Sequence, residues 1–265
     1  MNELQLAALP TPLLGVLVVG SAVALATAGL LLVRRIVPLH VLEANHEVGG
    51  ILIQIVAPAY SVLLAFTVFT VWTQYDEANT FVQQEANRLG NLFRNAQGLP
   101  DPERGQVQEA LRNYVQLVIN EEWEAMGRGE ASQHAWEAYD ELFNRYSAME
   151  PLSGRQANLY NRSLENLNAL GDLRTRRLLD CRSTLPGVLW ALLVGGGVIT
   201  TGFSYLFGTR NLWAQVLMTA AAAGTLAFFL FLILAIDLPF SGGLKLTPDA
   251  FQFVLEHAGP VTASQ

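Results

Sequence analysis

The sequence predicts an all-α integral membrane protein with four transmembrane helices and a helical domain between the second and the third. Three observations predict this class: long apolar runs free of charged residues, their arrangement as two pairs around a charged middle, and the lack of any strand pattern. A hydrocarbon core about 30 Å thick needs roughly 20 apolar residues of helix. Lipid offers the backbone no hydrogen-bond partner, so runs of this length must be helical. The four expected spans are Pro12–Val33, Gly49–Tyr75, Pro186–Phe207 and Leu212–Ile236.

Charge is unevenly distributed along the 265 residues. The chain is 51% hydrophobic and 15% charged, against about 25% charged residues in an ordinary soluble domain. Of its 16 basic and 23 acidic residues, 12 basic and 17 acidic ones lie between Asp76 and Arg182. The charged middle is therefore net acidic, which argues against a nucleic-acid surface. Cys181 is the only cysteine, so neither an intrachain disulfide nor a thiolate cluster can form.

A short connection should join the first two spans. The first span is too long for the apolar part of a cleavable signal peptide and ends at two arginines, so it should remain as a membrane anchor. Residues 36–48 then form a half-turn or an amphipathic stretch at the interface. The second span contains Pro58, which should kink the helix and free a backbone carbonyl. No breaker follows, so this helix should leave the membrane as one rod and run to Ala96.

The charged middle should fold as an extramembrane four-helix bundle. Its first helix is the extension of the second span, and two more are expected at Glu103–Met126 and Ser132–Ala148, with Ser132 as N-cap. The fourth helix starts near Gln156 and should run straight into the third span at Pro186.

The chain should therefore divide into four parts. These are 1–75 with two spans and a short basic loop, 76–185 with the helical domain, 186–238 with the last two spans, and the C-terminal tail 239–265. The tail contains several Pro and Gly residues and should be mostly loop, with one short helix near residues 250–257.

Basic residues in the short loops predict the side of the membrane on which the domain lies. Two arginines follow the first span and Arg210 lies between the last two, whereas the tails carry only Lys245. This count predicts a multi-pass protein with the helical domain and both termini outside. Four arginines just before the third span favour the opposite side, but long loops count for less in this rule.

The sequence contains no constellation typical of catalysis, of a cofactor or of a metal ion. None of the four histidines has a two-histidine metal spacing, and the neighbours His46 and Glu47 point in different directions on a helix. Gly195–Gly197 lies within a span, where small residues favour close helix packing. The acids of Glu121–Glu124 are interpreted either as solvated side chains or as a cation site. We therefore expect no enzyme activity.

The arginines before the third span allow two interpretations. They could attract anions or anionic lipid headgroups, or pair with Asp172, Asp180 and acids on neighbouring helices. The group consists of Arg174, Arg176, Arg177 and Arg182.

Polar residues on the second span are the candidates for a pathway. Gln54, Pro58 and Ser61 fall on one face at helical spacing, and a second polar group falls roughly opposite. That second group contains Tyr60, Thr67, Thr70 and Gln74, and the two groups without Tyr60 are the six pore-lining candidates. Polar side chains in a span usually face protein or water. One face could line a pore in an oligomer while the other packs within the subunit; interhelical hydrogen bonding alone would also explain both.

Four stretches carry a family resemblance: Asn45–Gly50, Ala59–Phe66, Glu85–Leu89 onward to Arg94, and Asp237–Gly242. Together they resemble an uncharacterised bacterial membrane family that is often labelled bestrophin-like. The resemblance covers nearly the whole chain and implies a four-span protein of a bacterial membrane, expected to be the cytoplasmic (inner) membrane. The layout is also similar to that of true bestrophins, which are pentameric anion channels with a cytosolic helical domain. Their pore-neck motif is not found on the second span, so no pore residue is carried over, and layout alone does not establish function.

The leading hypothesis is a homo-oligomeric membrane channel for small ions, with anions as the first candidate. In this hypothesis the second span faces the axis and the arginine-bearing helices form a vestibule. The alternative is a non-conducting sensor or scaffold whose helical domain binds a partner and whose spans only anchor it. The expected partners are the lipid bilayer, further copies of the chain and small ions, with no nucleic acid and no cofactor.

Overall fold

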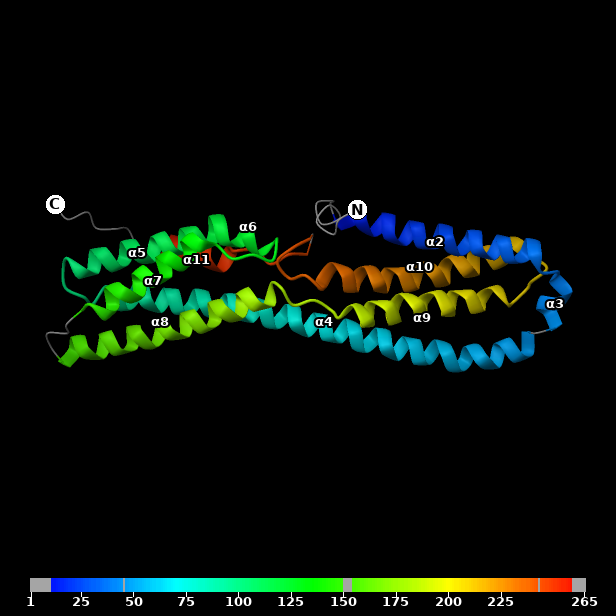
Figure 1. Cartoon of the computed structure of the whole chain (residues 1–265), viewed down its shortest axis with the longest axis horizontal. Helices are drawn as coiled ribbons and strands as arrows, with labels where there is room; N and C mark the ends of the chain where they lie inside the picture. The colour runs from blue at the N-terminus through cyan, green and yellow to red at the C-terminus, as the bar shows by residue number, and fades with distance from the viewer. Residues whose placement is uncertain (1–10, 45, 150–153, 243, 259–265) are drawn as a thin grey trace. The chain divides into compact units, whose positions relative to one another are not determined.

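A computed structural model describes residues 11–44, 46–149, 154–242 and 244–258. Every regular element among these residues is a helix, which confirms the all-α class (Figure 1). The chain forms two compact units. The first contains Met1–Gln74, Thr184–Asp237 and Gly242–Leu244, and the second contains Tyr75–Ser183, Leu238–Ser241 and Lys245–Gln265.

Four helices in the described residues are long and apolar enough to cross a membrane. They are α2 (Thr11–Ile36), α4 (His46–Ala96), α9 (Gly187–Tyr205) and α10 (Leu212–Ile236), and the short α3 (Leu39–Ala44) connects the first two. Each contains nearly all of one expected span. The charge-free runs predicted their places because length and apolar composition decide whether a helix can cross lipid.

Small side chains bring α2 and α10 together in the first unit, where α2, α9 and α10 contact one another (Figure 1). Ala26 of α2 and Ala223 and Ala227 of α10 are buried. A Cβ added to Gly224 would lie 3.4 Å from the Val23 side chain, at ordinary contact distance. Lipid tails are as apolar as the helices themselves, so close packing of small residues is what favours their association.

The second unit has one buried core that several helices share. The part of α4 after Gln74 packs with α5 (Glu103–Leu117), η1 (Val118–Glu122, a π-helical turn), α6 (Trp123–Met126), α7 (Gln133–Ser147), α8 (Gly154–Asp180) and α11 (Asp249–His257). Ser132 is the N-cap of α7, as predicted, and its hydroxyl accepts a hydrogen bond from the Ala135 N–H at 3.2 Å. Each of these helices contributes a fully buried side chain, in chain order Leu92, Leu111, Val118, Met126, Leu142, Leu167 and Phe251.

The second span continues as one helix beyond the membrane unit, as predicted, but the third is not joined to the helix before it. Helix α4 is unbroken from His46 to Ala96. Helix α8 ends at Asp180, residues 181–186 are not helical, and α9 begins after Pro186. The predicted continuation of the fourth domain helix into the third span is therefore wrong. Pro186 lacks an N–H and disfavours helical backbone in the preceding residue, so it starts α9 instead of continuing α8.

The predicted short helix of the tail is confirmed as α11, and the tail also packs in a way that the sequence did not predict. Phe240, Leu246 and Phe251 are buried in the core of the second unit. The Trp123 indole donates a hydrogen bond to the Leu246 carbonyl at 2.9 Å. The same indole packs edge-on against both phenylalanine rings. This segment is part of the fold of the second unit.

Candidate functional site

The membrane half of α4 has one face that packs within the first unit. Tyr60, Thr67 and Val71 are buried on this face at helical spacing. The Tyr60 hydroxyl donates a hydrogen bond to the Leu193 carbonyl of α9 at 2.7 Å. Its ring lies against Gly196, where a Cβ would collide with the ring. The glycine stretch of the third span therefore allows close helix packing, as predicted, because only a residue without a side chain leaves room for this ring.

The other face of this half is open, and three of the predicted pore-lining residues lie on it. The side chains of Gln54, Pro58 and Ser61 are exposed. Pro58 has no N–H, so the Gln54 carbonyl four residues earlier lacks its helical donor. The Ser61 hydroxyl donates to the Ala57 carbonyl at 2.8 Å, which leaves its oxygen free to accept. The open face thus presents hydrogen-bonding groups that do not pack within the chain.

The other three pore-lining candidates do not share one environment. Thr67 is buried on the packed face, whereas Thr70 and Gln74 are exposed. Both threonine hydroxyls donate to carbonyls one turn earlier, at 2.9 Å. Such a bond satisfies the donor without a partner from another helix. A pore-lining role of the six residues stays a prediction, and their exposure separates Thr67 from the other five.

Two of the four candidate arginines belong to a buried ion network in the second unit. Arg174 and Arg177 of α8, Glu85 of α4 and Glu122 of η1 each have 0% of their side-chain surface exposed. Arg177 Nε lies 2.6 Å from Glu85 Oε2, and Arg177 Nη2 lies 3.0 Å from Glu122 Oε2. Arg174 Nη2 lies 2.6 Å from Glu122 Oε1. Two positive and two negative charges therefore balance within the core, which buried ions require.

Aromatic side chains complete the surroundings of this network. The Tyr114 hydroxyl donates a hydrogen bond to Glu85 Oε1 at 3.2 Å. The Arg174 guanidinium carbon lies 4.0 Å from the centre of the Trp136 ring. A cation over an aromatic face is stabilised more strongly where water is excluded. The network thus links side chains from α4, α5, η1, α7 and α8.

The network controls the protonation of its own members. Burial alone would raise the pKa of Glu122, but the guanidiniums of Arg177 and Arg174 outweigh burial and hold this pKa below its ordinary value. Burial disfavours the charged form of Arg177, yet the carboxylates of Glu85 and Glu122 raise its pKa overall. Burial, and then the Glu85 carboxylate, raise the pKa of Tyr114 well above its ordinary value. At neutral pH Glu122 is therefore ionised and Tyr114 is protonated.

The other two candidate arginines are exposed. The Arg176 guanidinium carbon lies 5.5 Å from the centre of the Phe81 ring, and Arg182 Nε donates to the Gly129 carbonyl at 2.8 Å. Pairing with acids on neighbouring helices, the second interpretation of this group, describes the two buried arginines. The role in binding anions or lipid headgroups stays a prediction for the group, and Arg176 and Arg182 are the members that a dissolved anion or a headgroup can reach.

The acids of residues 121–124 point to three different partners. Glu121 Oε2 lies 2.8 Å from His134 Nδ1, Glu122 belongs to the buried network, and Glu124 Oε1 lies 2.9 Å from Arg128 Nη1. In the described ranges, no group of three or more His, Cys, Asp or Glu side chains is placed to hold a metal ion.

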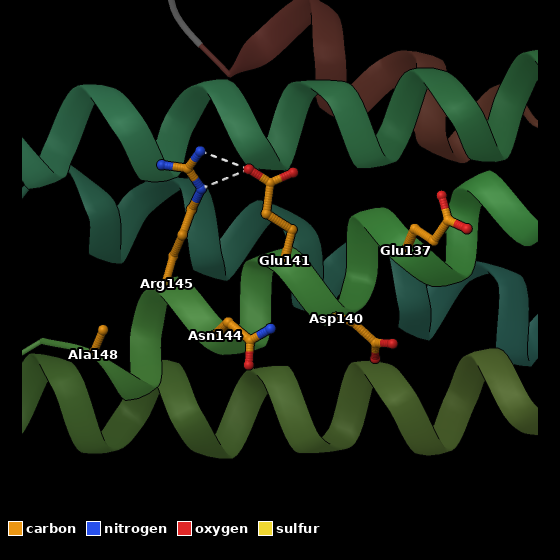
Figure 2. A pocket seen from close by; sticks show the side chains of 6 residues that line it. All are labelled: Glu137, Asp140, Glu141, Asn144, Arg145 and Ala148. Atoms are coloured by element: carbon orange, nitrogen blue, oxygen red, sulfur yellow. Dashed lines mark hydrogen bonds and ion pairs between the residues drawn. The ribbon is translucent and has the colours of Figure 1, made fainter.

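A shallow depression along α7 is also rich in acids (Figure 2). Figure 2 shows Arg145 turned toward Glu141, and Arg145 Nη2 lies 2.6 Å from Glu141 Oε1. In the same view, the side chains of Asp140 and Asn144 point away from this pair. The carboxylates of this surface therefore do not converge on one point.

Glu85 was not identified as a functional residue from the sequence, although a signal for it exists. It lies on the stripe of α4 that also contains Val82, Ala86 and Leu89, all of them buried. A charged residue on a buried stripe requires a partner of opposite charge. Arg174 lies in the same way on the buried stripe of α8 that contains Leu167 and Leu170. The two stripes together predict an ion pair across the core. Neither stripe, however, indicates which residue is the partner.

The comparisons with known proteins agree with this architecture. A sequence model described as the Bestrophin-like domain matches residues 20–251. No curated protein matches the chain. A mutant of a bacterial bestrophin homolog from Klebsiella pneumoniae is similar in structure, with a TM-score of 0.70, 11% identity, and 93% of this chain and 99% of that chain covered.

Two further crystal structures resemble the chain to the same degree. Another structure of the Klebsiella pneumoniae homolog has a TM-score of 0.67 at 11% identity and covers 89% of this chain and 95% of its own. A structure described as a membrane protein has a TM-score of 0.69 at 11% identity, with coverage of 91% and 99%. Similarity at this identity shows a common fold. Since the domain match spans well over half of the sequence, this multi-pass membrane protein belongs to the bestrophin-like family.

Proposed function

We propose that the protein is a homo-oligomeric ion channel in which the open face of α4 lines the pathway. The observation that carries the proposal is the difference between the two faces of the membrane half of α4. Tyr60 and Thr67 are buried, whereas Gln54, Pro58 and Ser61 are exposed. A face that is polar and unpacked within one chain is better placed on a water-filled axis between chains than against lipid.

The groups on this face suit a passive pathway. Gln54 offers an amide donor and an amide acceptor, and its backbone carbonyl has no helical partner. Ser61 keeps a free acceptor after donating to the Ala57 carbonyl. Neutral groups of this kind replace part of an ion's hydration shell without holding the ion tightly. Their donors allow anions to pass, and the layout of the family supports anions as the first ions to examine.

Flux through liposomes that contain the purified protein tests the proposal. Ser61→Leu should lower flux strongly because it replaces a polar group on the proposed axis by a bulky apolar one. Ser21→Leu is the matched control, since Ser21 is an exposed serine of α2 whose hydroxyl donates to its own helix, to the Val18 carbonyl at 3.0 Å. Chloride and sodium gradients measured separately assign the ion. Equal effects of the two variants, or no flux in the wild type, contradict the proposed axis.

Single-particle imaging of the purified protein tests the oligomer independently. A ring of several copies with α4 around the axis supports the channel. A monomer or a sealed dimer contradicts it and favours the sensor or scaffold, whose helical unit binds a partner.

The proposal also covers which membrane contains the protein and on which side of it the helical unit lies. The protein is assigned to the bacterial cytoplasmic membrane. The Lys and Arg count favours a helical unit outside, whereas the similarity in layout to true bestrophins favours a helical unit inside. Labelling with a maleimide that does not cross the membrane determines the side of the helical unit. The experiment uses a Cys181→Ser background, so that only an introduced cysteine can react. Reaction of Asn87→Cys from outside, with His40→Cys protected, supports the count; the reverse pattern supports the family layout.

A further inference from the structure

A polar cavity lies beside α4 directly after its membrane half. Its volume is about 320 Å³, roughly ten times the ~30 Å³ that one water molecule occupies in the liquid. All of its lining residues belong to the second unit. Six of them are polar: Tyr75, Asn79 and Gln83 of α4, Lys245 and Thr247 before α11, and Asp249, the first residue of α11. The cavity is therefore large enough for a group of several heavy atoms and is lined mainly by hydrogen-bonding side chains.

The cavity carries one charge of each sign. Lys245 is the only lysine of the chain, and its side chain is exposed. Asp249 Oδ2 accepts a hydrogen bond from the Thr247 hydroxyl at 2.7 Å. In the part of the chain that the structure describes, Lys245, Asn79 and Gln83 make no side-chain hydrogen bond or ion pair with protein. These groups are available to a ligand that offers both an anion and a cation.

The position of the cavity along α4 matches the headgroup layer of a membrane. Trp72 and Tyr75 form the aromatic pair that is typical of the membrane interface. A helix rises about 1.5 Å per residue, so Asn79 lies about 6 Å and Gln83 about 12 Å beyond Tyr75 along the axis. The headgroup regions add about 10–15 Å in total to a 30 Å hydrocarbon core. The lining residue Asn79 is therefore at the depth of the phosphates and amines of phospholipids.

We propose that this cavity binds the headgroup of an amine-bearing phospholipid of the phosphoethanolamine type. The Lys245 ammonium binds the phosphate through charge-assisted hydrogen bonds. The primary ammonium of the lipid donates to the Asp249 carboxylate and to the amide oxygen of Asn79. A quaternary ammonium has no N–H to donate and depends on aromatic faces, of which the lining offers only Tyr75. An anionic headgroup without an amine leaves Asp249 without its partner.

Native mass spectrometry of the delipidated full-length protein tests this assignment. The probes are phosphatidylethanolamine, phosphatidylcholine and phosphatidylglycerol with identical acyl chains. Phosphatidylethanolamine should be retained best. Lys245→Gln should weaken its binding about tenfold, since one charge-assisted contact is lost, and Lys245→Arg should retain it. Asp249→Asn should weaken phosphatidylethanolamine alone. Asn79→Leu, which fills the cavity without changing charge, should weaken all three lipids.

Arg162→Gln is the matched control, because it removes one positive charge from an exposed position on α8. It should leave the lipid preference unchanged. A thermal unfolding midpoint equal to that of the wild type shows that each variant is folded. Equal retention of the three lipids, or equal effects of Lys245→Gln and Arg162→Gln, would overturn the proposal. Displacement of the lipid by equimolar free phosphoethanolamine would also overturn it, since the site would then bind a soluble molecule.

Discussion

Arg174 and Arg177 place two positive charges in a core where Glu85 and Glu122 place two negative ones. Burying such a set costs several kcal/mol of desolvation for each ion, and the mutual attraction offsets this only when every member keeps its partner. Arg177 bridges both carboxylates, so loss of either glutamate leaves an arginine with unbalanced charge. The stability of the second unit is thus more sensitive to one lost charge here than at its surface.

Glu122→Gln tests this sensitivity. The variant should lower the free energy of unfolding by about 3–5 kcal/mol because it leaves the buried Arg174 without a carboxylate. Glu124→Gln is the matched control: Glu124 is exposed and pairs with exposed Arg128, and such surface pairs contribute about 0–1 kcal/mol. Thermal unfolding of both variants in the same detergent measures the difference. Equal unfolding midpoints would contradict the assigned role of the network.

Low pH should destabilise the second unit by protonating Glu122. The pKa of Glu122 in the folded protein lies below its ordinary value of 4.5, so its contribution to stability is complete above that value. The contribution is lost as the pH falls through the lowered pKa. Unfolding midpoints measured across the acid range should therefore fall less steeply for Glu122→Gln than for the wild type. Parallel curves would contradict the assigned linkage.

At the scale of elements, contact between α4 and α9 depends on two glycines that face Tyr60, Gly196 most of all and Gly197, where a Cβ would lie 3.1 Å from the Tyr60 hydroxyl oxygen. A Cβ on Gly196 would collide with the Tyr60 ring, whereas a Cβ on the adjacent Gly195 would meet no atom within 4 Å. Sequence reasoning identified the glycine stretch as a packing surface, but it could not say which glycine faces a neighbour. The direction of each residue depends on the rotation of α9 about its axis, and a run of three glycines leaves that rotation open.

Gly196→Ala and Gly195→Ala form a matched pair on this helix. Gly196→Ala should lower the thermal unfolding midpoint because the Tyr60 ring must move, which weakens its hydrogen bond to Leu193. Gly195→Ala should raise it slightly, since alanine favours helix over glycine by up to about 1 kcal/mol. Tyr60→Ala combined with Gly196→Ala should remove the penalty of the added methyl group. A destabilisation that is unchanged in the Tyr60→Ala background would show that another contact is responsible.

At the scale of the whole molecule, the chain returns to its second unit after the last span. Phe251 of α11 is fully buried there, its ring centre 5.6 Å from the Arg177 guanidinium carbon, while Phe253 two residues later is 61% exposed. The C-terminal segment therefore contributes to the same core as residues that lie more than a hundred positions earlier in the sequence, such as Leu142 and Leu92.

Phe251→Ala and Phe253→Ala measure what α11 contributes. Truncation of a buried phenylalanine should lower the free energy of unfolding by about 3–5 kcal/mol. Truncation of Phe253 should change it little, because its ring stacks only on the exposed His257 among the described residues. Denaturant unfolding followed by Trp fluorescence compares the two variants. A small effect of Phe251→Ala would mean that α11 is not required for the core.

The spans were predictable and the packing between distant segments was not. Apolar length identifies α2, α4, α9 and α10, and the lack of a breaker after Tyr75 identifies the extension of α4. The break before Pro186 was also present in the sequence, since proline disfavours helix in the residue before it. No local pattern, however, shows that Leu246 accepts a hydrogen bond from Trp123 or that Glu122 meets Arg174. Such contacts depend on how the segments come together in three dimensions.

The two carboxylate contacts of Arg177 also limit how α4 can move. Adjacent residues on a helix point about 100° apart, so turning this part of α4 about its own axis would carry Glu85 away from Arg177. The Glu85 carboxylate would then be buried without an arginine, and Arg177 would keep only Glu122. Tilting or bending leaves that pairing intact. Rotation of α4 about its axis is therefore restrained at Glu85. Pro58, where one backbone hydrogen bond is already missing, is the residue at which α4 bends most easily.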